Sequence, residues 1–184
     1  MSKSDPPSPL TGSLLLASPS LRDPNFNRSV IYLAAHSEED GSFGYVLNRP
    51  LEQKVAELLP DQELGALGRV QVFIGGPVST NKLAFASLHW SRSSGTLHCK
   101  THLSVHDAMH ELSMGHDVRG FVGYSGWSKG QVEREIQHRS WIVTTPVRQV
   151  LTLKPEAGLW NSLLEGMGPV YQLISRTPEK VELN

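Results

Sequence analysis

The glycine-bounded segment Gly123-Tyr124-Ser125-Gly126-Trp127 contains the residues most suited to chemistry. The pattern predicts that this segment lies between a strand and a helix, where free backbone N–H groups at a helix start bind phosphate or carboxylate. We favour a structural alternative over this anion site. The two glycines would permit tight backbone geometry while Ser125 or Ser128 caps the helix.

Ser125 also allows a catalytic hypothesis. A serine at a strand-to-helix turn is typical of the nucleophile elbow of hydrolases, but that motif needs a glycine two residues after the serine, where Trp127 stands. A hydrolase would further need a histidine, His36 or His89, within about 3 Å of the Ser125 hydroxyl. We keep a Ser125 hydrolase as the alternative and expect no enzyme.

Gly75-Gly76-Pro77 is a second glycine-rich corner. A phosphate loop would require a following Gly-Lys-Ser/Thr, which is absent, and Lys82 stands too far along to replace it. The simpler interpretation is a tight turn packed against another element. If this corner lies beside the Gly123–Trp127 segment, the two would form one glycine-walled pocket.

Histidines crowd the middle of the chain, and with Cys99 they suggest a metal site. His106 and His110 have the spacing of a zinc-protease helix, with Asp107 where the general base would be. Alternation along a strand separates His98 from Cys99, and the helical pair flanks the apolar stripe towards solvent. We therefore interpret the pair as a surface feature and expect neither a metal nor a cofactor.

The elements that must position these residues indicate an α+β fold, with a mixed or antiparallel sheet and helices concentrated in the C-terminal half. The predicted strands span residues 12–17, 29–35, 43–47, 70–74, 83–90, 96–101, 118–124 and 140–145. Helices are predicted over residues 53–59, 104–115, 127–138, from 155 onward and again from 169. The strand–helix–strand passage over residues 118–145 is compatible with a right-handed crossover between parallel strands. Residues 133–135 read as a solvated helix face.

Composition limits the possible partners. The formal net charge is −1 over 184 residues, without a basic stripe, which argues against nucleic acid. The single Cys99 fits a reducing compartment. No segment has the apolar length of a signal peptide or a membrane span. We expect a cytoplasmic protein with a disordered lead-in over residues 1–10 and one domain over residues 11–184.

Several segments together resemble the YqgE/AlgH family of bacterial proteins. They are Gly12–Ala17, Asp23–Val30, His36, Gly44–Pro50, Gly75–Val78, His89, Gly123–Trp127, Gly130-Gln131, Glu135-Ile136 and Trp141. The order and spacing of these segments cover nearly the whole chain. The resemblance implies a compact α+β fold and a family without accepted catalytic residues. One member is labelled a regulator of alginate synthesis genes, which makes a transcriptional regulator a further alternative.

From the residues and the resemblance we expect a non-enzymatic module that binds a small anionic ligand or a protein partner, with a regulatory role and an oligomer left open. The candidate ligand-binding residues are Arg28, His36, Asn48, Gly75, Gly76, His89, Tyr124, Ser125, Gly126 and Gln131. Those at strand ends, such as Arg28 and Asn48, either line a polar pocket or satisfy buried backbone groups around irregular turns.

Overall fold

The computed structural model describes residues 10–152 and 158–175, and within them nine strands form one sheet. The strands are β1 (Leu14–Ala17), β2 (Val30–Ser37), β3 (Gly41–Val46), β4 (Pro50–Lys54), β5 (Gln71–Ile74), β6 (Val78–Ser91), β7 (Thr96–Leu103), β8 (Asp117–Trp127) and β9 (Trp141–Thr144). Their order is β4-β5-β8-β3-β2-β1-β9, and β6 branches from β8 and carries β7. With its helices this makes an α+β fold, as the pattern predicts.

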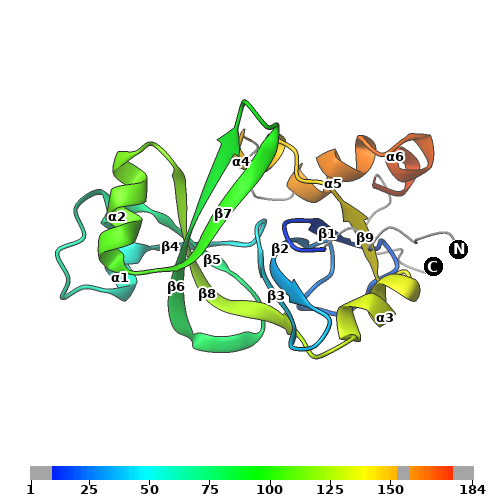
Figure 1. Ribbon diagram of the computed structural model, residues 1–184, viewed down its shortest axis with the longest axis horizontal. Helices are drawn as coiled ribbons and strands as arrows, with labels where there is room; N and C mark the ends of the chain where they lie inside the picture. Colours follow the sequence, from blue (N-terminus) through cyan, green and yellow to red (C-terminus); the bar gives the residue numbers. More distant parts are fainter. Residues whose placement is uncertain (1–9, 153–157, 176–184) are drawn as a thin grey trace, which may run out of the picture.

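The long strand β8 joins the two ends of the molecule (Figure 1). Its first half pairs with β5 in parallel and with β6 in antiparallel register, and its last residues pair with β3. Strand β9 pairs with β1 and not with β8, so the predicted crossover between parallel neighbours is wrong. The helix after β8 instead carries the chain to the far edge of the sheet.

Six α-helices lie around the strands. They are α1 (Val55–Leu58), α2 (Val105–Ser113), α3 (Gln131–Gln137), α4 (Gln149–Thr152), α5 (Gly158–Glu165) and α6 (Pro169–Ser175), with a 3-10 turn over Gly65–Arg69. Helix α2 lies within the predicted range 104–115, and Ser104 caps it, since the Asp107 N–H donates to Ser104 Oγ at 3.0 Å. Helices α1 and α2 lie at one end and α3, α5 and α6 at the other (Figure 1). Among these helices none has the length and apolar character needed to cross a membrane.

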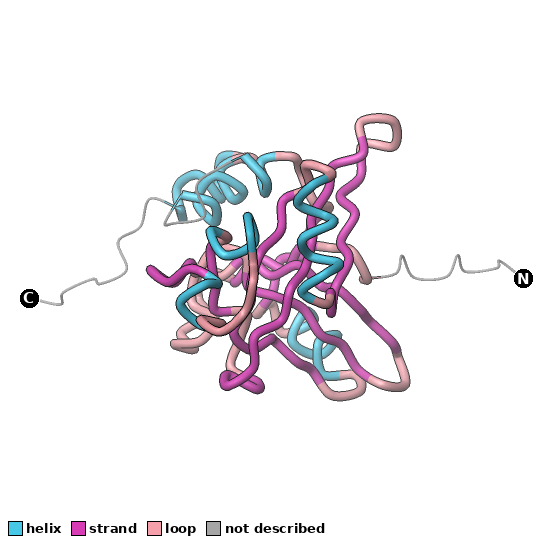
Figure 2. Tube along the Cα trace, turned by 90° about the vertical axis from the view of Figure 1, so that its left-hand side faces the viewer, coloured by secondary structure: helices cyan, strands magenta, loops and turns pink. Residues whose placement is uncertain are grey.

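The strands predicted over residues 83–90 and 96–101 pair as the β6–β7 hairpin, and its tip projects beyond the other strands (Figures 1 and 2). Strand β6 begins at Val78, earlier than its apolar pattern indicates. The reason is that β6 also pairs with β8 around a register shift between Val78 and Leu83, where exposed polar residues interrupt the alternation.

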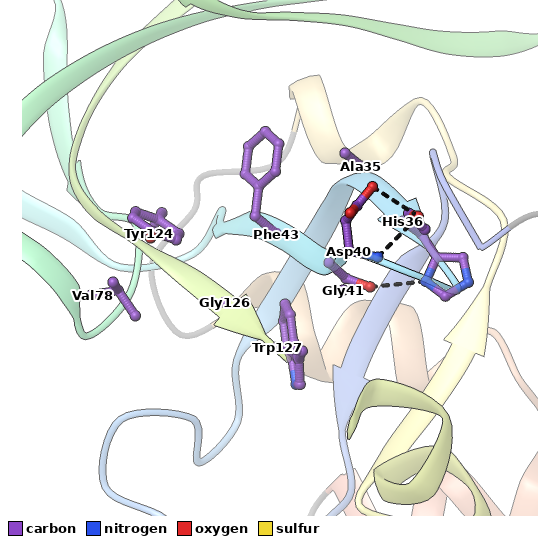
Figure 3. A pocket seen from close by; sticks show the side chains of 11 residues that line it. Ala35, His36, Asp40, Gly41, Phe43, Val78, Tyr124, Gly126 and Trp127 are labelled. Atoms are coloured by element: carbon purple, nitrogen blue, oxygen red, sulfur yellow. Dashed lines mark hydrogen bonds between the residues drawn. The ribbon is translucent and has the colours of Figure 1, made fainter. Parts of the chain in front are cut away.

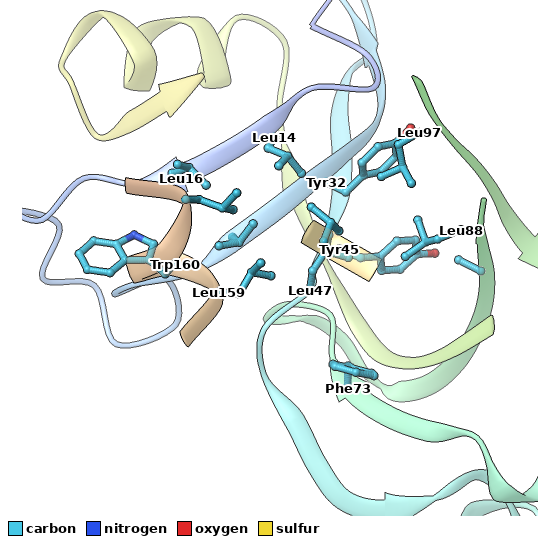
Figure 4. Packing of buried hydrophobic residues seen from close by; sticks show 14 of the residues in the cluster. Leu14, Leu16, Tyr32, Tyr45, Leu47, Phe73, Leu88, Leu97, Leu159 and Trp160 are labelled. Atoms are coloured by element: carbon cyan, nitrogen blue, oxygen red, sulfur yellow. The ribbon is translucent and has the colours of Figure 1, made fainter. Parts of the chain in front are cut away.

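The main core lies between the β1–β2–β3 strands and helix α5 (Figure 4). Leu14 and Leu16 face Leu159 and Trp160 there, and the Trp160 indole donates to the Ala17 carbonyl at 2.9 Å. A second cluster holds Trp127 and Trp141, and a third packs α1 and α2 on the other end of the sheet. All three clusters support the strands that carry the candidate residues. The expectations for residues 1–9 and for the helix start at Pro155 lie outside the described residues.

Candidate functional site

The Gly123–Trp127 segment is the second half of strand β8, which corrects its predicted place between a strand and a helix. Gly126 pairs with Phe43 of β3 and Tyr124 with Val78 of β6, so this backbone belongs to the sheet. Helix α3 starts only at Gln131. The predicted anion site on helix-start amides is therefore wrong for this segment. The aromatic residues Tyr124 and Trp127 were the sequence signal for a strand that continues through this segment.

The two glycine corners lie side by side, but they fill each other's space. The Gly75 N–H donates to the Val122 carbonyl at 2.9 Å, and a Cβ built on Gly75 would stand 2.3 Å from the Gly123 oxygen. A Cβ on Gly76 would stand 2.3 Å from Tyr124 backbone atoms. The two glycines are thus needed for close backbone approach, and no glycine-walled pocket opens between them.

Ser125 is fully buried, and its hydroxyl donates to the Gly75 carbonyl at 3.0 Å. The two histidines considered as its base have other neighbours: the His36 ring bonds Ser42 at 2.8 Å, and His89 lies against His116. Among the described residues, no histidine contact to the Ser125 hydroxyl is present. The geometry gives the hydrolase alternative no support.

Three further candidate residues make local contacts that hold turns and helix ends. The Asn48 amide donates to the Arg28 carbonyl and accepts from the Val30 N–H, each at 2.9 Å. The Arg28 guanidinium lies over the Trp160 ring. Gln131 accepts from the Ser128 N–H at 3.0 Å, so it closes the turn before α3. The structural alternative accounts for these three side chains.

His36, Tyr124 and Gly126 come together in a cleft of about 580 Å³, here called the His36 cleft (Figure 3). Phe43, Val78 and Trp127 also line it, while Ser37, Asp40 and Ser42 supply polar groups near His36. The Phe43 and Tyr124 rings meet edge to face, with centroids 6.3 Å apart. The cleft therefore offers aromatic walls and one polar end, which suits a molecule with a planar ring.

Tyr124 also lines a second cavity of about 380 Å³, here called the Lys82 cavity. Tyr45, Lys82 and His102 line it as well, and no carboxylate stands among its lining residues. The His102 ring lies 5.3 Å from the Phe43 ring, which joins this cavity to the aromatic wall of the His36 cleft. Lys82 stands too far from Gly76 in the sequence for a phosphate loop. It reaches this cavity through the register shift in β6, which has no sequence signature.

The backbone around the Lys82 cavity carries strain. Ser79 and His102 both line the cavity and both adopt a left-handed conformation, with φ of 52° and 56°. Such φ values are uncommon for residues other than glycine and gather at ligand-binding sites more than elsewhere. Two such residues therefore lie on one cavity.

His89 lies in a third cavity, of about 310 Å³, here called the Glu111 cavity. Its lining residues are Ser87, His89, Ser91, His98, Lys100, Glu111 and His116. The Glu111 carboxylate is 5% exposed and accepts from Lys100 Nζ at 2.6 Å, His116 Nδ1 at 2.7 Å and Ser87 Oγ at 2.8 Å. The hydrogen bonds from Lys100 and then His116 lower the pKa of Glu111 to about 2.

The Glu111 pKa gives a pH prediction. Because folding lowers this pKa from 4.5, the stabilisation is complete above about pH 4.5 and is lost as the pH falls towards 2. We expect urea unfolding to show a fall in stability between pH 6 and pH 3 that is smaller in Glu111→Gln, although that variant is less stable at pH 6. Parallel pH profiles for the two proteins would contradict the assignment.

The other histidines do not form a metal centre. Within residues 10–152 and 158–175, no three His, Cys, Asp or Glu side chains are placed to hold a metal ion. His106 has a side chain 91% exposed and contacts only its neighbour Asp107 at 3.5 Å. This agrees with the surface interpretation of the His106 and His110 pair.

Both the sequence and the fold match known proteins over nearly the whole chain. The AlgH-like family model matches residues 14–172. A UPF0301 protein of Mycobacterium ulcerans is 36% identical and one of Parabacteroides distasonis 32% identical, over 94% and 96% of this chain and 90% and 92% of theirs. The solution structure of the AlgH protein from Pseudomonas aeruginosa superposes with a TM-score of 0.67 at 28% identity, covering 98% of this chain and all of that one.

A crystal structure of a Corynebacterium diphtheriae protein has the same fold, with a TM-score of 0.64 at 21% identity over 96% of this chain and 95% of that one. The family model and the relatives agree with the resemblance carried by the glycine segments and by the strand-end residues. The chain belongs to the AlgH-like family.

Proposed function

We propose that the protein is a non-enzymatic binding module for a small anionic molecule that carries a planar ring. The ring would pack in the His36 cleft against Tyr124, and the anionic group would reach Lys82. His36, Tyr124 and Gly126 keep their predicted ligand-binding role in this proposal, while Gly75, Gly76 and Ser125 support the strand that carries them.

The observation that carries the proposal is that Tyr124 lines both cavities, one aromatic and the other cationic. A ring stacked on Tyr124 or Phe43 would give affinity with little selectivity for its substituents. Lys82, on a surface strand and without a carboxylate beside it in the cavity, offers a charge-assisted hydrogen bond. Ser79 and His102, the two residues with a left-handed φ, line the cavity in which the anionic group of the ligand would bind.

The proposal involves no proton-transfer step, and it does not use the Ser125 hydroxyl as a nucleophile. His36 is held by Ser42 at 2.8 Å and lies 3.6 Å from Glu133, and the nearby Ser125 hydroxyl is turned away to Gly75. A nucleophile paired with a base is what catalysis by acyl transfer would require. Among the described residues the Ser125 hydroxyl has no such base beside it, which supports binding rather than catalysis at Ser125.

A ligand panel tests this proposal. Nucleoside monophosphates and aromatic carboxylates, which combine a ring with an anion, should raise the midpoint of thermal unfolding more than adenosine or inorganic phosphate alone. No stabilisation by any ring-bearing anion would overturn the proposal.

The binding residues are tested with the best ligand of that panel. Tyr124→Ala and Lys82→Ala should each weaken its binding about tenfold in calorimetric titration, since each removes one contact worth roughly 1–2 kcal/mol. Arg148→Ala, an exposed cation outside both cavities, is the matched control and should bind as the wild type. Equal affinity in all three variants would place the ligand elsewhere.

A further inference from the structure

One face of the β6–β7 hairpin gathers polar and basic side chains at alternate positions. His89 lies opposite His98 in the strand register, and Ser87 lies opposite Lys100. Alternate residues of a strand share a face, so these four side chains project to the same side. Helix α2 and the loop after it close that side with Glu111 and His116 and complete the Glu111 cavity.

The buried carboxylate fixes the state of its neighbours. An ionised carboxylate only accepts hydrogen bonds, so the His116 Nδ1, 2.7 Å from Glu111, must carry a proton and donate. This orients the His116 ring and leaves its Nε2 free of Glu111. The His89 ring lies 4.4 Å from the His116 ring. Two imidazoles therefore stand together at the cavity, one of them held in position.

The charged groups that line the cavity do not repel an anion as a set. Lys100 and Glu111 cancel each other at 2.6 Å, so the imidazoles of His89, His98 and His116 set the remaining charge. Each imidazole that takes a second proton adds a positive charge and a donor. The lining of the cavity contains no second carboxylate.

The neighbouring strand β8 contributes no opposing charge. Asp117 pairs in register with Leu88, whose side chain is in the main core, and so lies on the other face of the sheet from Ser87 and His89. Its carboxylate is held by Arg119 at 2.7 Å. At the hairpin side, His98 Nε2 lies 3.2 Å from the Thr96 hydroxyl, which is uncharged.

We propose that the Glu111 cavity is a second binding site, specific for a small tetrahedral oxyanion such as the phosphate group of a small molecule. The anion accepts from the imidazoles of His89, His98 and His116 and from the Lys100 ammonium. This site is separate from the two cavities at Tyr124 and uses different residues. Its affinity rises when protonation of these imidazoles adds positive charge and further donors to the cavity.

Sulfate is the probe that tests this, because its charge does not change between pH 8 and 5.5, so any pH dependence of its binding comes from the protein. The histidine ring resonances of the full chain are followed by NMR during sulfate titrations at several pH values. We expect saturable shifts of the His89, His98 and His116 rings, with affinity about tenfold or more higher at pH 5.5 than at pH 8. Glycerol phosphate at pH 6.5 should shift the same three rings.

The variant His89→Ala/His98→Ala provides the structural control, because neither side chain bonds Glu111 and the buried carboxylate keeps its three donors. It should fold as the wild type does and bind sulfate at pH 5.5 at least tenfold more weakly. His106→Ala, on the exposed face of α2, should bind as the wild type. A pH-independent sulfate affinity, or an unchanged affinity in the double variant, would overturn the proposal.

Discussion

Replacing Glu135 with alanine is expected to lower the free energy of unfolding by roughly 2–5 kcal/mol, because two buried indole N–H groups lose their acceptor. Glu135 Oε2 accepts from Trp127 Nε1 at 2.9 Å and from Trp141 Nε1 at 2.7 Å. The two tryptophans are only 5% and 4% exposed, so water does not replace the lost acceptor. For a chain of this size, the midpoint of thermal unfolding should fall by about 5–15 °C.

Two companion variants separate the lost acceptor from other effects of the change. Glu135→Gln keeps one oxygen acceptor and should lose clearly less stability than the alanine variant. Arg134→Ala, on the exposed face of the same helix, tests the helix itself and should change stability by less than about 1 kcal/mol. An alanine variant as stable as the glutamine variant would show that the indole contacts carry no net stabilisation.

The tertiary contacts of Glu135 could not be predicted from the sequence pattern. Residues 133–135 read as a charged, solvated stretch, yet Glu135 lies against two aromatic side chains that come from β8 and β9. Strand β9 pairs with β1 at the far edge of the sheet, and this placement depends on pairing between residues more than a hundred positions apart. Local periodicity identifies the helix α3, but it does not report which tertiary neighbours face it.

The fold class, the β6–β7 hairpin and the capped α2 helix were predictable because each depends on nearby residues. Ser104 caps α2 at its own first turn, and the hairpin runs are separated by a short loop. The end of β8 was not predictable in this way. Its two glycines are typical of a turn, whereas here Gly123 adopts a left-handed φ inside a strand that bends between β6 and β3.

The candidate site was predictable in part. His36, Tyr124 and Gly126 do meet in one cleft, because β3 pairs on one side with β2, which carries His36, and on the other with β8, which carries Tyr124 and Gly126. Lys82 and Glu111 were missed for different reasons. Lys82 reaches its cavity through a register shift in β6, and Glu111 reads as a helix surface residue until Lys100 and His116 are placed around it.

The close backbone approach between Gly75 and Gly123 gives the second large effect. A methyl group on Gly75 would stand 2.3 Å from the Gly123 oxygen and 3.0 Å from the Tyr45 ring. The backbone has no freedom to retreat. The Gly75 N–H donates to Val122, and the Gly75 carbonyl accepts from the Val46 N–H at 2.9 Å and from the Ser125 hydroxyl at 3.0 Å.

We therefore expect Gly75→Ala to cost about 3 kcal/mol or more in the free energy of unfolding, since relieving the overlap breaks some of these three hydrogen bonds. Urea unfolding measures the loss, and reduced yield of folded protein would accompany it. Gly158→Ala is the control, because a Cβ there meets no atom of the described residues within 4 Å and should change stability by less than about 1 kcal/mol. The opposite result would be unfolding of Gly75→Ala at the same urea concentration as the wild type. In that case β5 and β8 would lie further apart than described, and the backbone behind Tyr124 would not be rigid.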